Sequence, residues 1–252
     1  MKNQVISMRI DVLTIFPRMF DGPFSESILA RAVNKGLLSI NIIDLRQYAY
    51  DKHRTVDDYP FGGGPGMVMK PAPFFLALED LQQSCQGDPM RVILLCPGGK
   101  VFNQEVAQEL SKQSGLVFLC GHYEGIDDRV RQRFVTDEIS IGDYVLTGGE
   151  LASMVIIDAV ARLLPGVLGD ACSTAEESFS DGLLEYPQYT RPRDYQGLCV
   201  PDVLLSGNHE EVRRWRRKES LRRTLLNRPD LIAAANLSDQ DRRLLAEIAS
   251  EI

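Results

Sequence analysis

Apolar and polar positions in the first two thirds of the chain alternate between short strand-like runs and longer helical ones. Residues 8–16 predict a strand, because apolar side chains recur there at every second position. The same reasoning predicts strands at residues 38–45, 91–96 and 116–120, and helices at 25–34, 71–83, 103–112 and 150–164, with Asn103 as an N-cap. Strands that alternate with helices of this size indicate an α/β fold with a largely parallel sheet.

The pattern changes after Pro165. Residues 165–192 are rich in Pro, Gly, Ser and Thr and lack a helical period, so we expect a linker. Beyond it, residues 208–227, 229–236 and 238–249 predict three helices of a small all-α domain. Ser238 and Asp241 resemble a capping box, with Asp in place of the usual Glu or Gln.

The charge is divided unevenly along the chain. The net charge is -7, but residues 1–185 hold 16 basic against 25 acidic residues, whereas residues 186–252 hold 12 against 10. Residues 212–228 hold eight basic residues and one acid. An acidic body with one basic segment favours a polyanion-binding surface near the C-terminus.

The composition indicates the cellular compartment and excludes several kinds of site. No apolar run approaches the roughly 18 residues of a membrane span, and the first residues lack an apolar signal core. Five dispersed Cys without a CxxC pair, and three distant His, argue against a disulfide framework or a zinc site. We therefore expect a cytoplasmic protein that does not bind a membrane.

Three glycine-rich stretches adjoin predicted strands or helices, at residues 96–100, 121–127 and 141–150. Ligands of open α/β sheets bind at the carboxyl ends of the strands, and glycine lets the backbone approach a ligand closely. Together the stretches favour a small-molecule pocket, although each alone is also typical of turns and helix caps. None fits a P-loop or a dinucleotide fingerprint.

A fourth stretch, residues 62–66 with the sequence GGGPG, follows the polar string of residues 51–55. It predicts either a hairpin tip or a lid that covers a substrate, because lids need residues that tolerate large backbone changes. His53 alone is more often a hydrogen-bonded structural residue than a catalyst.

Several long motifs identify a resemblance that runs from Met8 to the C-terminus. The strings HRTVDDYPFGGGPGMVM, CGHYEGIDDRV, SIGDYVLTGGE, RLLPGVLG, EYPQYTRP and LLSGNHEEVRRWR resemble the bacterial tRNA (guanine-N1)-methyltransferases. The resemblance implies methylation of N1 of guanosine 37, beside the anticodon. It also implies a SPOUT-type parallel sheet with a trefoil knot near its C-terminal end, although general topology rules disfavour knots. Residues 1–7 are expected to be an extension.

The resemblance also implies a domain plan, a cofactor and an oligomeric state. Residues 1–168 would form the methyltransferase domain, 169–188 the linker and 189–252 the tRNA-binding domain. S-adenosylmethionine would bind in the knot of a homodimer, and Mg²⁺ would be used for turnover, with Glu124 as a candidate contributor and the metal ligands unknown. The matched cofactor-binding positions are Pro97, Gly98, Gly121, Tyr123, Glu124, Gly125, Ile141, Gly142, Tyr144, Leu146, Gly148 and Gly149.

The chemistry of guanine narrows the catalytic candidates. N1 carries a proton, so attack on a sulfonium methyl needs a base near N1 and a partner for the charge that gathers on O6. Arg162 lies on a helix whose faces are almost entirely apolar, at a position where the family has an essential arginine. The alternative is an ion pair with Asp158, worth about 0.3–0.5 kcal/mol.

The position of the family's general base matches Glu177, whose side chain is one methylene longer than that of the Asp that the family often has. Glu and Asp have similar basicity, so the function need not be lost. Glu176 is the base only if the register slips, and a solvated acid pair is the alternative to both.

A helical wheel over residues 212–226 places Arg213, Arg216, Arg217 and Arg223 on one arc. These arginines would contact the phosphates of the anticodon stem-loop region, and Tyr189, Arg191 and Arg193 would extend the surface. The alternative is a solvated basic face.

A noncatalytic RNA-binding module with structural glycine loops is the competing function. A nucleotide-dependent enzyme that uses GGGPG as a phosphate cradle ranks last, because no Lys-Ser/Thr pair follows the glycines.

Overall fold

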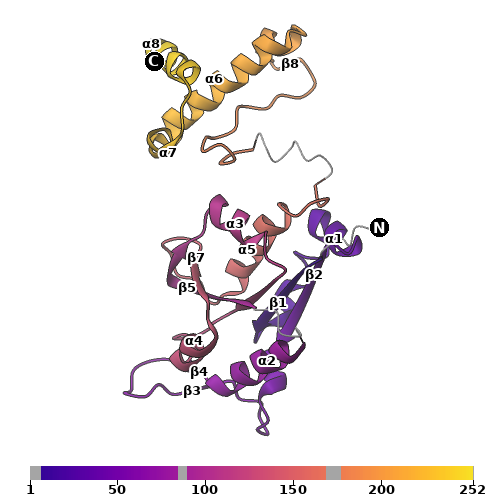
Figure 1. Cartoon of the computed structure of the whole chain (residues 1–252), viewed down its shortest axis with the longest axis vertical. Coiled ribbons are helices and arrows are strands. Elements are labelled where there is room, and N and C mark those ends of the chain that lie inside the picture. The colour runs from indigo at the N-terminus through magenta and orange to yellow at the C-terminus, as the bar shows by residue number, and fades with distance from the viewer. Residues whose placement is uncertain (1–6, 85–89, 169–176, 252) are drawn as a thin grey trace. The chain divides into compact units, whose positions relative to one another are not determined.

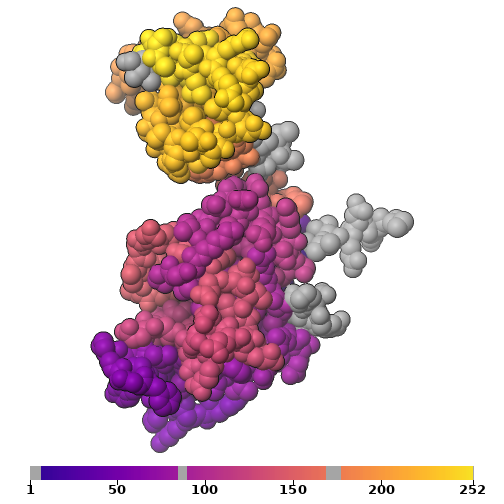
Figure 2. Space-filling model, turned by 60° about the vertical axis from the view of Figure 1, so that its left-hand side comes forward, coloured from indigo at the N-terminus to yellow at the C-terminus, as the bar shows by residue number. Residues whose placement is uncertain are grey.

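The computed structural model of the chain describes residues 7–84, 90–168 and 177–251 (Figure 1). It divides into two compact units, Met1–Gly169 and Asp170–Ile252. The space-filling view shows each unit as a closely packed body (Figure 2). Among the described residues, no helix has the length and apolarity needed to cross a membrane.

A five-stranded parallel sheet forms the centre of the N-terminal unit. Its strands are β1 (Met8–Thr14), β2 (Leu38–Asp44), β5 (Arg91–Val101), β6 (Gly115–Leu119) and β7 (Asp137–Ser140), in the order β2-β1-β6-β5-β7. All pairings are parallel, with Arg9 opposite Gly115 between β1 and β6. The predicted α/β class with a parallel sheet is therefore confirmed.

Helices cover both faces of the sheet (Figure 1). Because side chains alternate along a strand, Ile10 and Val12 enter one core and Leu13 enters the other. The first core also holds residues of α1 (Ser27–Asn34), α3 (Gln104–Leu110) and α5 (Glu150–Ala161). The second holds residues of α2 (Pro71–Ser84), α4 (Asp128–Phe134) and the short helix η2 (Leu45–Tyr48). Another short helix, η1 (Pro17–Phe20), follows β1.

Several boundaries differ from the prediction. The N-cap at Asn103 is confirmed, because its side chain accepts a hydrogen bond of 3.0 Å from the Val106 amide. β5, however, does not end at Cys96. It continues to Val101 after a register shift against β7, so the first glycine-rich stretch belongs to an irregular strand. A Cβ at Gly99 would lie 2.4 Å from the Glu138 backbone, which explains why glycine stands at this close approach.

The long polar stretch after β2 folds into η2 and a small hairpin. Its strands are β3 (Asp57–Asp58) and β4 (Val68–Met69), which pair antiparallel. The hairpin interpretation of GGGPG is confirmed, and the lid stays a prediction. Phe61 at the tip is 99% exposed, and Gly62, Gly63 and Gly64 all have positive φ, a conformation that favours glycine.

The three predicted C-terminal helices are confirmed as α6 (His209–Asn227), α7 (Pro229–Ala234) and α8 (Asp239–Glu251). They follow a hairpin of β8 (Asp194–Tyr195) and β9 (Leu198–Cys199) and the short helix η3 (Asp202–Leu205). The capping box is confirmed, since Ser238 Oγ accepts from the Asp241 amide at 3.1 Å and donates to its carboxylate at 2.8 Å. The small core consists of Leu183, Leu221, Leu244 and Ile248.

Candidate active site

A cavity of about 440 Å³ lies at the carboxyl ends of β6 and β7 and beside the middle of β5. Its walls are residues 94–97 of β5, the loop after β6 (residues 121–126), the loop after β7 (residues 141–149) and Ala152 of α5. Twelve residues of β5 and of these two loops were predicted to bind the cofactor, and all of them but Gly98 line the cavity: Pro97, Gly121, Tyr123, Glu124, Gly125, Ile141, Gly142, Tyr144, Leu146, Gly148 and Gly149. Their role in binding S-adenosylmethionine stays a prediction.

Two glycines let the walls of this cavity lie against each other. The Gly149 amide donates a 3.1 Å hydrogen bond to the carbonyl oxygen of Gly121. A Cβ at Gly149 would lie 2.8 Å from the Cα of Cys120, and one at Gly148 would lie 2.2 Å from the ring of His122. Both distances are shorter than a nonbonded carbon contact allows, so larger residues here would push the two loops apart.

A buried carboxylate joins two of the segments that form the cavity to β1. Glu150, at the start of α5, is 1% exposed. Its Oε1 accepts a 2.6 Å hydrogen bond from Thr14 Oγ1 at the end of β1, and its Oε2 lies 2.7 Å from His122 Nε2 in the loop after β6. The His122 ring also packs edge-on against Phe16, with centroids 4.8 Å apart. Because a buried charge needs partners, Glu150 fixes the distance between β1, this loop and α5.

The base of the β3–β4 hairpin lies against the same cavity loop. The Glu124 amide donates to the carbonyl oxygen of Met67 at 3.0 Å, and the Met69 amide donates to that of Gly125 at 2.9 Å. A Cβ at Gly66 would lie 2.4 Å from the Glu124 carboxylate. The hairpin is therefore fixed at its base to a wall of the cavity, while its glycine-rich tip lies in solvent.

The charged groups that line the cavity are mainly acidic. Glu124 is exposed, and Glu138 accepts from Arg131 Nη1 at 3.3 Å and from Cys96 Sγ at 3.5 Å. Burial and the Glu138 carboxylate raise the pKa of the Cys96 thiol. Burial raises the pKa of Cys120 well above its usual value, which makes a nucleophilic thiolate there unfavourable. In the described part of the chain, no three or more His, Cys, Asp or Glu gather as a metal site.

The two predicted catalytic residues belong to different units. Arg162 is the C-cap of α5 and is half-buried, with its amide donating to the carbonyl oxygen of Asp158 at 3.2 Å. Glu177 lies in the C-terminal unit, beside a hollow of about 180 Å³ that Arg213 and Arg216 also line. Their meeting around one guanine stays a prediction. Glu176 lies outside the described residues.

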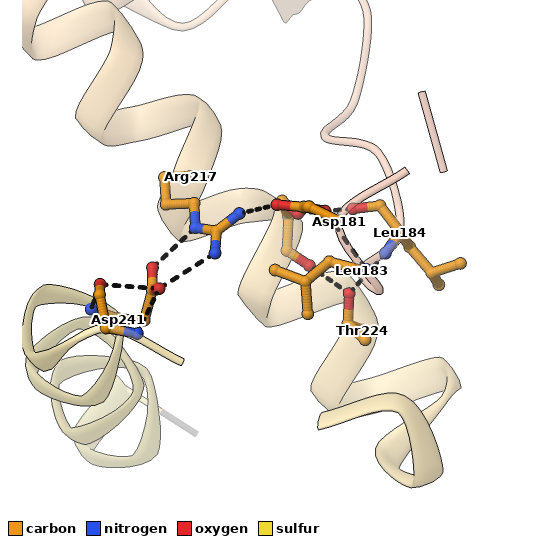
Figure 3. Close-up of polar contacts among 8 residues, drawn as sticks. Asp181, Leu183, Leu184, Arg217, Thr224 and Asp241 are labelled. Atoms are coloured by element: carbon orange, nitrogen blue, oxygen red, sulfur yellow. Dashed lines mark hydrogen bonds and ion pairs between the residues drawn. The ribbon is translucent and has the colours of Figure 1, made fainter. Parts of the chain in front are cut away.

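Of the four predicted arginines on α6, two contact side chains within the C-terminal unit and two are exposed to solvent. Arg217 Nε donates to Asp241 at 2.7 Å, and its Nη1 contacts Asp181 (Figure 3). This pairing raises the pKa of Arg217 and lowers that of Asp241 to about 2. Arg216 lies over the ring of Tyr186, 4.8 Å from its centroid. The other two arginines of the arc, Arg213 and Arg223, are exposed, and Arg223 donates to a backbone carbonyl oxygen at 3.0 Å.

Comparison with known proteins gives consistent matches along almost the whole chain. A sequence model of the family described as tRNA (Guanine-1)-methyltransferase TrmD matches residues 8–234. A relative from Moorella thermoacetica is 61% identical over 242 residues, which is 96% of this chain and 97% of that protein. Relatives from Dictyoglomus turgidum and Geobacillus kaustophilus are 59% and 58% identical, over 97% of this chain and 98% and 99% of theirs. All three are named tRNA (guanine-N(1)-)-methyltransferase.

Proposed function

Since the chain belongs to the tRNA (guanine-1)-methyltransferase family, we propose that it transfers a methyl group from S-adenosylmethionine to N1 of guanosine 37 in tRNA. The observation that carries this proposal is the cavity of about 440 Å³ beside three parallel strands, walled by the loops that match the family motifs. A noncatalytic RNA-binding module would not need such a cavity in its α/β unit, so we do not favour that alternative.

The cavity suits S-adenosylmethionine in size and charge. Its volume lies in the range of about 300–1,000 Å³ that is usual for small-molecule sites. Apolar side chains such as Leu95, Ile139 and Leu146 offer a surface to an adenine ring, and the Glu124 and Glu138 carboxylates favour a cationic ligand. When bound, the cofactor supplies an electrophilic methyl group on a positively charged sulfur. We also propose that the loops around this cavity form the SPOUT-type trefoil knot of the family.

The chain's own residues then act on the guanine. Glu177 would remove the proton from N1, which frees the lone pair that attacks the methyl group. Arg162 would donate hydrogen bonds to O6 and stabilise the negative charge that develops there. Because these residues come from different units, we propose that tRNA binding brings residues 1–168 and the helical domain, 189–252, together through the linker, 169–188, within a homodimer.

Two further roles follow from the same proposal. Arg213 and Arg223, which are exposed on α6, would contact phosphates of the anticodon stem-loop region, together with Arg216 and Arg217 where their internal contacts allow. Mg²⁺ would assist turnover, but the described residues do not form a metal cluster, so we assign it no step. The cytoplasmic location stays a prediction.

The test is methyl transfer from labelled S-adenosylmethionine to tRNA transcripts that carry guanosine or adenosine at position 37. We expect 1-methylguanosine in the first transcript and no transfer to the second. Equilibrium binding of S-adenosylmethionine without tRNA is measured in parallel. Methylation at another base, or a protein that binds tRNA but not the cofactor, would overturn the proposal.

A further inference from the structure

The C-terminal unit contains a second and larger hollow, of about 530 Å³. It lies between residues 186–193, the short helix η3 and the first turns of α6. Val200 and Leu204 contribute apolar surface to it. Of the four arginines predicted to contact RNA on α6, Arg216 alone lines this hollow. The hollow is therefore distinct from the surface that those arginines form.

Aromatic rings form much of its wall. The rings of Tyr189 and Trp215 have centroids 6.3 Å apart and are tilted by 54°. Tyr189 is 49% exposed, so a large part of its surface remains open to a ligand. The Arg216 guanidinium, also in the wall, lies over the Tyr186 ring, 4.8 Å from its centroid. Flat rings and guanidinium planes that are partly open to solvent are the surfaces on which RNA-binding proteins stack unpaired bases.

Cationic groups lie next to these rings. Arg191 and Arg193 both line the hollow and are exposed. Arg193 pairs with Asp202 at 3.0 Å, but both side chains are mostly in solvent, so this contact is weak and exchangeable. Two arginines beside a stacking surface suit the phosphate that accompanies each base of an RNA strand.

We propose that this hollow binds one unpaired nucleotide of the tRNA, with its base stacked on Tyr189 and Trp215 and its phosphate held by Arg191 and Arg193. The inference rests on the proposed function, since it takes tRNA as the partner. The slight basic excess of residues 186–252, with 12 basic against 10 acidic residues, suits a polyanion such as RNA. The aromatic walls favour a base over a phosphate alone.

Trp215 makes the test direct, because it is the only tryptophan of the chain. The full chain is titrated with an RNA stem-loop that carries an unpaired loop, and with a blunt duplex of the same base composition. We expect the stem-loop to quench the Trp215 emission and protect it from acrylamide, with the midpoint of RNA binding measured independently by filter retention. The duplex is expected to do neither.

Substitutions of two exposed residues then test the stacking surface and the phosphate contact separately. Tyr189→Ala is expected to weaken stem-loop binding about 10- to 100-fold, as loss of one stacked base does. Arg191→Ala is expected to reduce the salt dependence of binding by about one phosphate contact. The matched controls are Tyr195→Ala and Arg242→Ala, which remove an exposed ring and an exposed guanidinium of the same unit outside the hollow.

The possible negative results distinguish failure of the nucleotide site from failure of the proposed function. If RNA saturates the protein and is methylated while Trp215 emission and acrylamide access stay constant, the nucleotide site is wrong and the proposed function stands. The nucleotide site is equally wrong if the duplex quenches as strongly as the stem-loop, or if Tyr189→Ala binds no more weakly than Tyr195→Ala. If the chain neither binds nor methylates RNA, both proposals fail.

Discussion

Replacement of the buried carboxylate of Glu150 is the sharpest test of how the cavity is held together. Glu150→Ala removes the acceptor of a 2.6 Å hydrogen bond from Thr14 and the 2.7 Å partner of His122. Thr14 Oγ1 still accepts from the Phe16 amide, but its own hydroxyl proton loses its partner in a fully buried position. Leaving a buried polar group without its partner costs about 1–3 kcal/mol, and this substitution affects two such groups.

We take about 3 kcal/mol for the two groups together, since Thr14 keeps one hydrogen bond. With a urea dependence of about 2 kcal/mol per molar, the unfolding midpoint of the N-terminal unit should fall by about 1.5 M. Glu150→Gln keeps an acceptor for Thr14 and should lose about half as much stability.

Circular dichroism follows the unfolding of both units, whereas the fluorescence of Trp215 reports on the C-terminal unit alone. Only the transition of the N-terminal unit should move. Glu79→Ala, an exposed carboxylate on α2, is the matched control and should change stability by less than about 0.5 kcal/mol. A Glu150→Ala protein that unfolds within that same margin of the parent would refute the tethering role of this carboxylate.

Three other predictions test catalysis, pH dependence and packing. Glu177→Gln should slow single-turnover methyl transfer about 10²–10⁴-fold and leave equilibrium S-adenosylmethionine binding nearly unchanged; an unchanged rate excludes it as the base. Asp241 has its pKa lowered to about 2 by Arg217, so it stabilises the folded C-terminal unit above about pH 4 and loses that contribution as the pH falls toward 2. Asp241→Asn should therefore make the pH dependence of fluorescence-monitored unfolding smaller by about 2 kcal/mol over this window, and an unchanged dependence contradicts the role of this carboxylate. Gly149→Ala places a Cβ 2.8 Å from the Cα of Cys120 and should cost about 1–3 kcal/mol and weaken cofactor binding in calorimetry, whereas binding as tight as that of the parent contradicts the packing argument.

The sequence predicted the fold well wherever an element carried a full hydrophobic period. β1, β2 and β6 and the long helices α2, α5 and α6 lie close to their predicted ranges. α4 and β7 were missed because they are short and charged, and their positions depend on pairing and packing with distant segments. β5 runs five residues beyond its predicted end, because pairing with β7 overrides the turn preference of Pro97, Gly98 and Gly99.

The site was predictable only in part, for a related reason. Glycine-rich loops after strands are a local signal, and they do gather around one cavity. The tether of Thr14 to Glu150 joins residues 136 positions apart, so no local pattern could pair them. Likewise, a helical wheel places Arg217 on the basic arc but cannot reveal that Asp181 and Asp241 lie against it.

The strand order has a consequence for how the chain folds during synthesis. β1 lies between β2 and β6, and Arg9 pairs with Gly115, so one edge of β1 lacks its neighbour until more than a hundred further residues have been made. An apolar, unpaired strand edge readily pairs with another chain. Sheets built from such distant pairings also fold slowly. A nascent chain that ends before β6 is therefore a natural client for chaperones, and aggregation during expression should fall once residue 119 has left the ribosome.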